Sequence, residues 1–334
     1  INNHKVFTAC FNDSIDESKW AKLVVDRTDT NWIKCFPNPD EFLQDFEKIV
    51  YAQDLPFFSS STYAQFKVMQ SVKNAGVKVT LDGQGADELF TGYSPHFSSY
   101  VHQALSSFNF KTFFNELFYL ENNFANINII ANHYKKMTGK MFSNYFIKKG
   151  FRNLHQENKY INNVFWGNHK EQFRNILGEP NNNLNELLQY QTTGSDLKVL
   201  FRTGDRNSMC HSVESRVPFA DNKKLTEYIF NIPAVYKISN GTSKNLLREA
   251  FKEFLPNDIY NRKDKIGFST PEKTWIKQNN KQILELLPDL NDDYVDWQNI
   301  KNNWSSIVDN ACNTHTVRLW RLINFAIWRK VFNI

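Results

Sequence analysis

Short runs of β-prone residues alternate with longer amphipathic segments over the first hundred residues of the chain. Apolar, β-branched and aromatic residues cluster at 5–11, 32–36 and 77–81, which predicts three strands, the first of them buried. Between these runs, apolar side chains recur every three or four positions, a spacing typical of helices. Strands that alternate with helices in this way usually pair in parallel. The pattern therefore predicts an α/β fold with a doubly wound parallel sheet.

The helices in this first part carry boundary signals. Ser14 followed by Glu17 has the spacing of a capping box and predicts the start of one helix. Asn38 before Pro39 predicts the start of the next. The apolar face of that second helix comprises Phe42, Phe46, Ile49 and Val50. A third helix should end at Gly76, because glycine readily adopts the left-handed backbone of a helix terminus.

Beyond residue 100 the pattern is mainly helical. Aromatic side chains at helical spacing between 100 and about 195 are expected in the core. This stripe includes Phe108, Phe113, Phe114, Leu117 and Phe118. A helix is predicted to begin at Lys244 and to continue to residue 255. The amphipathic pattern of 317–331 predicts a last helix that closes the core.

Composition narrows the class of protein. The 334 residues include 40 Lys and Arg against 35 Asp and Glu, and no block of five like charges provides a nucleic-acid footprint. No apolar run reaches the roughly 18 residues of a membrane span. The four cysteines are widely spaced, which indicates reduced thiols rather than a zinc site or a disulfide framework. We therefore expect a cytoplasmic protein with neither nucleic acid nor membrane as a partner.

The clearest candidate chemistry follows the predicted strand 77–81. Gly83 and Gly85 would let the backbone pass close to a ligand where a Cβ would clash. Asp87 comes next, and Mg²⁺ usually takes only one or two protein carboxylates alongside phosphate oxygens. A carboxylate in a first helical turn also stabilises the helix dipole without any ligand. Both interpretations stay open from these residues alone.

Two further stretches concentrate ionisable side chains. The first contains Asp205, Arg206, Glu214 and Arg216, which we interpret mainly as buried Arg–carboxylate pairs at a helix–loop junction. The second is a basic loop that includes Lys265 and could clamp the charge that develops on phosphate oxygens. A solvated basic loop is the alternative for this second stretch.

Together these motifs resemble the synthetase domain of glutamine-hydrolysing asparagine synthetases, nearly end to end. The matching segments are Asp16-Glu17…Trp20-Ala21, Leu81 to Phe90 with Gly92-Tyr93, Asp205 to Met209, Glu214 to Phe219, Lys244…Leu247-Arg248, Lys265…Gly267 to Pro271, and Leu319-Trp320…Leu322…Trp328. The resemblance implies a sheet of the ATP pyrophosphatase type with a large helical C-terminal part. Residues 1–100 would be the nucleotide-binding part, and 101–334 the mainly helical remainder of the same domain.

The resemblance also implies a reaction. ATP would activate the side-chain carboxylate of aspartate as β-aspartyl-AMP with release of pyrophosphate, and ammonia from a glutaminase domain would then attack. ATP and Mg²⁺ are the implied cofactors, and the partners are these small molecules. The oligomeric state stays open, with a homodimer as one arrangement.

The resemblance assigns functional roles to the residues of this sequence that occupy the matching motif positions. The resemblance implies that Ala9 lines the adenine and that Asp82 and Gly83 contact the nucleotide. Asp87 would face Mg²⁺ and pyrophosphate, and Lys265 would neutralise the leaving group as a catalytic residue. For Lys244 and the charged residues of 205–216, a substrate contact and a structural ion pair remain alternatives.

Gln84 occupies a catalytic position where many family members carry an acidic residue associated with adenylate formation and with accepting the ammonia proton. An amide cannot act as a general base at neutral pH. A specialised amide-forming relative, of the β-lactam synthetase or lasso-peptide cyclase type, is therefore one alternative. A non-catalytic remnant domain is another.

Two features of the family are missing from the sequence. The S-G-G-x-D-S loop that would cradle pyrophosphate does not occur, and neither does the N-terminal glutaminase domain with its cysteine nucleophile. We expect a fragment truncated after that loop, which would be inactive alone although the full-length protein would form the amide.

Overall fold

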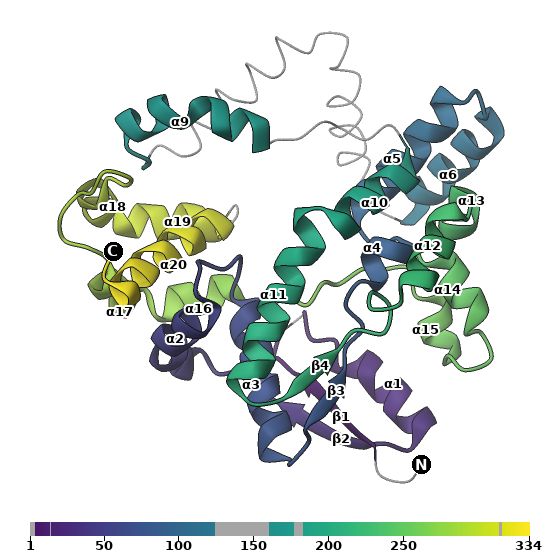
Figure 1. The fold of residues 1–334 in the computed structure, drawn as a ribbon, viewed down its shortest axis with the longest axis horizontal. Coiled ribbons are helices and arrows are strands. Elements are labelled where there is room, and N and C mark those ends of the chain that lie inside the picture. The colour runs from purple at the N-terminus through teal and green to yellow at the C-terminus, as the bar shows by residue number, and fades with distance from the viewer. Residues whose placement is uncertain (1–3, 14, 124–159, 177–182, 314–315) are drawn as a thin grey trace.

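The computed structural model describes residues 4–13, 15–123, 160–176, 183–313 and 316–334, which form a mostly helical molecule with small parallel sheets (Figure 1). The strands are β1 (Lys5–Ala9), β2 (Asn31–Cys35), β3 (Val79–Leu81) and β4 (Glu214–Arg216). The helices of the first half are α1 (Ser18–Thr28), α2 (Pro39–Gln53), α3 (Ser61–Asn74), α4 (Ala86–Phe90), α5 (Ser94–Ser106), α6 (Phe110–Asn123) and α9 (Asn163–Ile176). Those of the second half are α10 (Leu184–Thr193), α11 (Ser195–Cys210), α12 (Lys223–Asn231), α13 (Ala234–Lys237), α14 (Asn245–Ala250), α15 (Asn257–Asn261), α16 (Glu272–Gln278), α17 (Asn280–Leu286), α18 (Trp297–Asn302), α19 (Trp304–Asn313) and α20 (Val317–Phe332).

The strands form two separate parallel pairs. β1 pairs with β2 from Lys5 opposite Asn31 to Ala9 opposite Cys35, and β3 pairs with β4 over three residues. The parallel pairing and the α/β alternation are as expected. A continuous doubly wound sheet is not formed within the described ranges, because no ladder of backbone hydrogen bonds joins one pair to the other.

The capping box expected at Ser14 and Glu17 is wrong. Helix α1 begins at Ser18, and the backbone N–H of Ser18 donates to Asp16 Oδ1 at 2.7 Å. The Glu17 carboxylate instead accepts from Arg262 Nη2 at 2.8 Å. A tertiary ion pair thus takes the side chain that the local pattern assigned to the cap, while Ser14 lies outside the described residues.

The second and third helices begin and end as predicted. Asn38 Oδ1 accepts the backbone N–H of Asp40 at 2.9 Å, and Pro39 is the first residue of α2. Gly76 follows α3 with φ +72°, a conformation that side chains with a Cβ rarely adopt.

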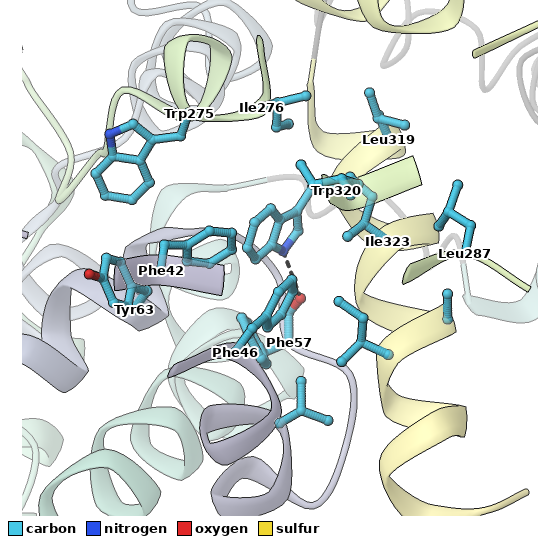
Figure 2. Packing of buried hydrophobic residues seen from close by; sticks show 14 of the residues in the cluster. Phe42, Phe46, Phe57, Tyr63, Trp275, Ile276, Leu287, Leu319, Trp320 and Ile323 are labelled. Carbon is cyan, nitrogen blue, oxygen red and sulfur yellow. Dashed lines mark hydrogen bonds between the residues drawn. The ribbon is translucent and has the colours of Figure 1, made fainter. Parts of the chain in front are cut away.

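The main core joins the two ends of the chain. Trp320 of α20 is 1% exposed and lies against Phe42 and Phe46 of α2, with ring centroids 5.5 and 5.4 Å away (Figure 2). Its indole N–H donates to the carbonyl oxygen of Phe57 at 3.2 Å. The predicted apolar face of α2 is therefore confirmed, and its partner is the predicted C-terminal helix.

Two expectations for the helical part need correction. The helix expected over 244–255 is shorter, because α14 ends at Ala250 and Lys244 precedes it in the left-handed conformation at φ 55°. The aromatic stripe is only partly core, since Phe108, Phe114 and Phe118 are 79, 64 and 62% exposed. Spacing alone shows that side chains share a face, but not that another element covers that face.

The length and hydropathy of the helices bear on whether the chain could cross a membrane. Across the described ranges, none of them combines the length and the apolar character needed to cross a bilayer.

Candidate functional site

Three segments that are far apart in the chain meet at Asp87. This residue lies in the first turn of α4, directly after the glycine-containing loop that follows β3. Lys244, at the start of α14, places its Nζ 2.8 Å from Asp87 Oδ1. Lys265, in the loop between α15 and α16, places its Nζ 3.1 Å from Oδ2. Helices α4 and α14 contact each other, which fits this convergence.

The carboxylate of Asp87 stays ionised although it is largely enclosed. Its side chain is 19% exposed, and burial alone raises its pKa. The charges and hydrogen bonds of Lys244 and Lys265 outweigh burial and hold the pKa below its ordinary value. Two ammonium groups around one carboxylate leave one net positive charge, so the cluster attracts anions.

A cavity of about 480 Å³ opens beside this cluster. Lys244 and Lys265 contribute to its wall, together with Gly92 and apolar side chains such as Leu247 and Phe251. A cavity of this size suits a small molecule. The polar part of its wall also includes Glu17, Ser243, Arg248, Arg262 and Asp264, and the two lysines are the members that also contact Asp87.

The loop before Asp87 is held by its own hydrogen bonds. The Asp82 carboxylate accepts the backbone N–H groups of Gly83 and Gln84; burial raises its pKa and these bonds partly oppose that rise. Gly85 has φ +89°, and a Cβ there would lie 2.8 Å from Ala220 Cβ. Gly83 has no neighbour within 4 Å of such a Cβ. Protein packing thus explains Gly85, whereas no contact among the described residues requires glycine at 83.

The remaining loop and strand residues are placed as follows. Gln84 is half-buried in the loop, and Ala9 ends β1 with 8% of its surface exposed. The ion pairs described for Asp87 involve neither of them. Their expected contacts with substrate and adenine stay predictions.

The ionisable stretch around 205–216 is not a set of buried pairs. Arg206 pairs with Asp54 at 2.6 Å, and both side chains are nearly half exposed. Arg216 pairs with Glu214 at 2.8 Å, and both are more than half exposed. Exposed pairs of this kind contribute roughly 0–1 kcal/mol. Asp205 is also exposed, because this side of α11 faces solvent.

Asn207 is one of the buried residues of that stretch, and the reasoning from charged residue types passed over it. It has no exposed surface, and its side chain donates to the Thr62 carbonyl oxygen and to Gln65 Oε1, each at 2.9 Å. It also accepts from Gln53 Nε2 at 2.9 Å. These bonds tie α11 to α2 and α3, so the motif has a structural explanation.

The ligand set suits only a metal that is shared with phosphate. Within the part of the chain that the structure describes, no three His, Cys, Asp or Glu residues gather as a metal site. Asp87 offers a single carboxylate, which fits Mg²⁺ held mainly by phosphate oxygens and water.

A buried lysine lies behind the cluster. The carbonyl oxygen of Lys237 accepts the hydroxyl of Thr91, four residues after Asp87, at 3.3 Å. The Lys237 side chain has no exposed surface, and its Nζ donates to Asn185 Oδ1 at 2.7 Å. Burial lowers its pKa from the ordinary 10.5 to about 8.

We expect the free energy of unfolding to rise as pH increases from about 8 to 10.5, because the unfolded chain binds the Lys237 proton more tightly than the folded chain does. Lys237→Met should remove this rise, which amounts to at most about 3 kcal/mol. Urea unfolding across this pH range measures the difference. Equal slopes for the native protein and the variant would contradict the prediction.

A glycine-containing loop after a strand, a lysine-paired carboxylate and an adjoining cavity define a candidate site for a phosphate-bearing ligand. The family model described as asparagine synthase matches residues 2–330. The chain therefore belongs to the asparagine synthase family.

Individual relatives agree with this assignment. Asparagine synthetase [glutamine-hydrolyzing] 1 of Bacillus subtilis (strain 168) is 27% identical over 320 residues, which cover 88% of this chain and 46% of that protein. Asparagine synthetase [glutamine-hydrolyzing] 3 of the same organism is 27% identical over 261 residues, covering 78% and 38%. Amidase chry2 of Gibberella zeae is 25% identical over 325 residues, covering 88% and 48%. The chain spans less than half the length of these relatives.

Proposed function

We propose that this chain is the ATP-dependent, amide-forming part of an asparagine synthetase-type enzyme. In the whole protein, aspartate would become asparagine through β-aspartyl-AMP, with ammonia derived from glutamine. The observation that carries the proposal is the convergence of Lys244 and Lys265 on Asp87, in a chain that matches the family over 2–330.

The cluster suits the departure of pyrophosphate. When a carboxylate attacks the α-phosphorus of ATP, the bond to the leaving pyrophosphate breaks and negative charge accumulates on its oxygens. Lys265 and Lys244 can turn from Asp87 toward those oxygens, since both already line the cavity. Cations preplaced where charge develops stabilise a transition state strongly in a partly enclosed site.

Asp87 would hold Mg²⁺ together with the phosphate oxygens, since it is the carboxylate that both lysines surround. A bound Mg²⁺ would offset part of the pyrophosphate charge. The two ammonium groups compete for the same carboxylate, so we propose that metal and phosphate bind together rather than in sequence. Asp82 and Gly83 would meet the nucleotide, and Ala9 its adenine.

Gln84 supports a second candidate, a specialised amide-forming relative that acts on another carboxylate. The amide cannot take the proton from ammonia, so another group or solvent must accept it or the substrate must differ. AMP release by the full-length protein in the presence of ATP, ammonia and a panel of carboxylates separates the two candidates. Turnover with aspartate alone would exclude the second, and turnover only with other acids would exclude the first.

We expect the chain to bind pyrophosphate more tightly with Mg²⁺ than without it, and Asp87→Asn to abolish the difference. The variant loses the metal's carboxylate but frees both lysines, so its affinity for metal-free pyrophosphate should equal or exceed the native one. Titration calorimetry with pyrophosphate, with and without Mg²⁺, measures both effects.

Lys265→Ala should weaken binding of the magnesium complex by about tenfold, roughly 1.4 kcal/mol. Lys22→Ala is the matched control, because this exposed lysine pairs with Asp26 on α1. An unchanged Mg²⁺ enhancement in Asp87→Asn would refute the assignment of Asp87. No detectable binding of magnesium ATP by the full-length protein would favour a non-catalytic remnant.

A further inference from the structure

The turn Thr91–Gly92–Tyr93, between α4 and α5, has no part in the chemistry proposed above but contacts all three members of the cluster. We infer that this turn is a positioning device: the Thr91 hydroxyl sets Lys244, and the Tyr93 ring sets Lys265, so that both ammonium groups meet on Asp87. The inference rests on the proposed function for its purpose, although its geometry stands independently of it.

Thr91 joins the backbone at Lys237 to the backbone at Lys244 through its hydroxyl. Its side chain is completely buried, donates to the Lys237 carbonyl oxygen at 3.3 Å and accepts the backbone N–H of Lys244 at 3.1 Å. Its backbone has φ +74°, which is unfavourable for a β-branched residue. A glycine would suit that backbone better, so the hydroxyl is the feature that threonine adds here.

Lys244 needs this support because it is itself in an uncommon conformation. Its φ is 55°, immediately before the first residue of α14. The preceding loop is fixed by buried Glu116, whose carboxylate oxygens accept the N–H groups of Asn240 and Gly241 at 2.9 Å each. Thr91 fixes the other end of the loop, and the Lys244 side chain then reaches Asp87 Oδ1.

Tyr93 acts on the second lysine. The Nζ of Lys265 lies 5.8 Å from the centre of the Tyr93 ring, within cation–π range. The phenol hydroxyl donates to Glu88 Oε1 at 2.7 Å. Because Glu88 is only 2% exposed, this hydrogen bond fixes the position of the ring. Lys265 is the more exposed lysine of the pair, and the ring restricts the directions that its side chain can take.

Gly92 completes the turn. Its backbone N–H donates to His96 Nδ1 at 2.9 Å. Burial lowers the pKa of His96 to about 4, so the ring remains a neutral acceptor at physiological pH. The ring's other nitrogen lies 2.6 Å from Gln191 Oε1, which anchors the imidazole to α10.

The experiment measures how fast each lysine reacts with an amine-acylating reagent, with peptide mass spectrometry as the readout and no ligand present. An ammonium group held on a carboxylate reacts slowly because the ion pair restricts the approach of the reagent to Nζ. Thr91→Val removes the hydroxyl at nearly constant shape, and Thr91→Gly removes it while relieving the strained backbone. Thr91→Ser keeps the hydroxyl and is the matched control.

We expect Lys244 to react about two- to fivefold faster in Thr91→Val and Thr91→Gly, the factor for losing a partly exposed ion pair, and at the native rate in Thr91→Ser. Tyr93→Leu should accelerate Lys265 by a similar factor. Lys67, paired with Glu41 and Asp45 elsewhere, is the internal reference. A native rate for Lys244 in both Thr91 variants, or a parallel rise at Lys67, would overturn the role of Thr91. An unchanged Lys265 in Tyr93→Leu would overturn that of Tyr93.

The same assay separates this inference from the proposed function. Magnesium pyrophosphate added to the native protein should protect Lys244 and Lys265 further. If it gives no protection while the Thr91 variants still expose Lys244, the turn positions the cluster as inferred and the pyrophosphate assignment fails. If protection occurs but the variants react like the native protein, the converse holds.

Discussion

Gly92→Ala should weaken the binding of magnesium pyrophosphate by at least about tenfold and destabilise the fold by about 1–3 kcal/mol, the usual cost of overpacking. A Cβ at this position would lie 1.6 Å from Asp87 Oδ1 and 2.5 Å from its Cγ. The carboxylate would have to turn away, and its contact with Lys244 would be lost. The side chain that must move is the proposed metal ligand, so function should suffer more than folding.

The matched control for this substitution is Gly167→Ala. A Cβ at Gly167, within α9, meets nothing within 4 Å, and alanine is preferred over glycine in helices by roughly 0.5–1 kcal/mol. This variant should fold at least as well as the native protein and bind pyrophosphate equally. Calorimetry and urea unfolding on both variants provide the comparison. Native binding by Gly92→Ala would mean that Asp87 is not the group that holds the ligand.

Trp320→Ala should lower the free energy of unfolding by about 3–5 kcal/mol, in the highest range for a single core substitution. Trp320 is 1% exposed, stacks on Phe46 at an interplanar angle of 14° and lies next to Phe57 (Figure 2). Its removal leaves a cavity between α2 and α20 and leaves the Phe57 carbonyl oxygen without the hydrogen bond from the indole N–H. Urea unfolding followed by far-ultraviolet circular dichroism measures the loss.

The control in this case is Leu290→Ala. Leu290 is 74% exposed, and substitutions at such positions usually change stability by less than about 0.5 kcal/mol. A loss for Trp320→Ala that is no larger than the loss for Leu290→Ala would mean that the two ends of the chain do not share one core.

Local signals in the sequence were most reliable where a single segment contains everything that decides its conformation. Helix α2 illustrates this, because its cap at Asn38, its first residue Pro39 and its apolar face all follow from one continuous stretch. The start of α1 shows the limit: Glu17 had the spacing of a cap but forms an ion pair with the distant Arg262. Local spacing could not anticipate a competing partner from the far end of the chain.

For the candidate site, too, the sequence identified individual residues better than the contacts between them. Asp87, Lys244 and Lys265 were each recognisable from their motifs, and the resemblance of those motifs to asparagine synthetases agrees with the family match over 2–330. The resemblance assigned Asp87 and Lys265 to the same pyrophosphate and so implied that they lie close together, which the distance of 3.1 Å agrees with. The contact of Lys244 with Asp87, and the part of Thr91 and Tyr93, could not be read from spacing, because no periodicity relates residues in separate loops. The prediction for the arginines near 205–216 was wrong. The charge-rich stretch suggested buried ion pairs, but α11 buries Asn207 and leaves the ion pairs exposed to solvent.

The amino-acid order by itself determined the helices and strands with strong local signals, the family and the identity of the charged groups, since each of these depends on neighbouring residues or on motif chemistry. The tertiary structure alone decided that one carboxylate is shared by two lysines, that a buried hydroxyl and an aromatic ring hold those lysines in place, and that the strands pair two by two. The physical reason is that ion pairing, burial and strand pairing depend on distances in space between segments that are far apart in the chain.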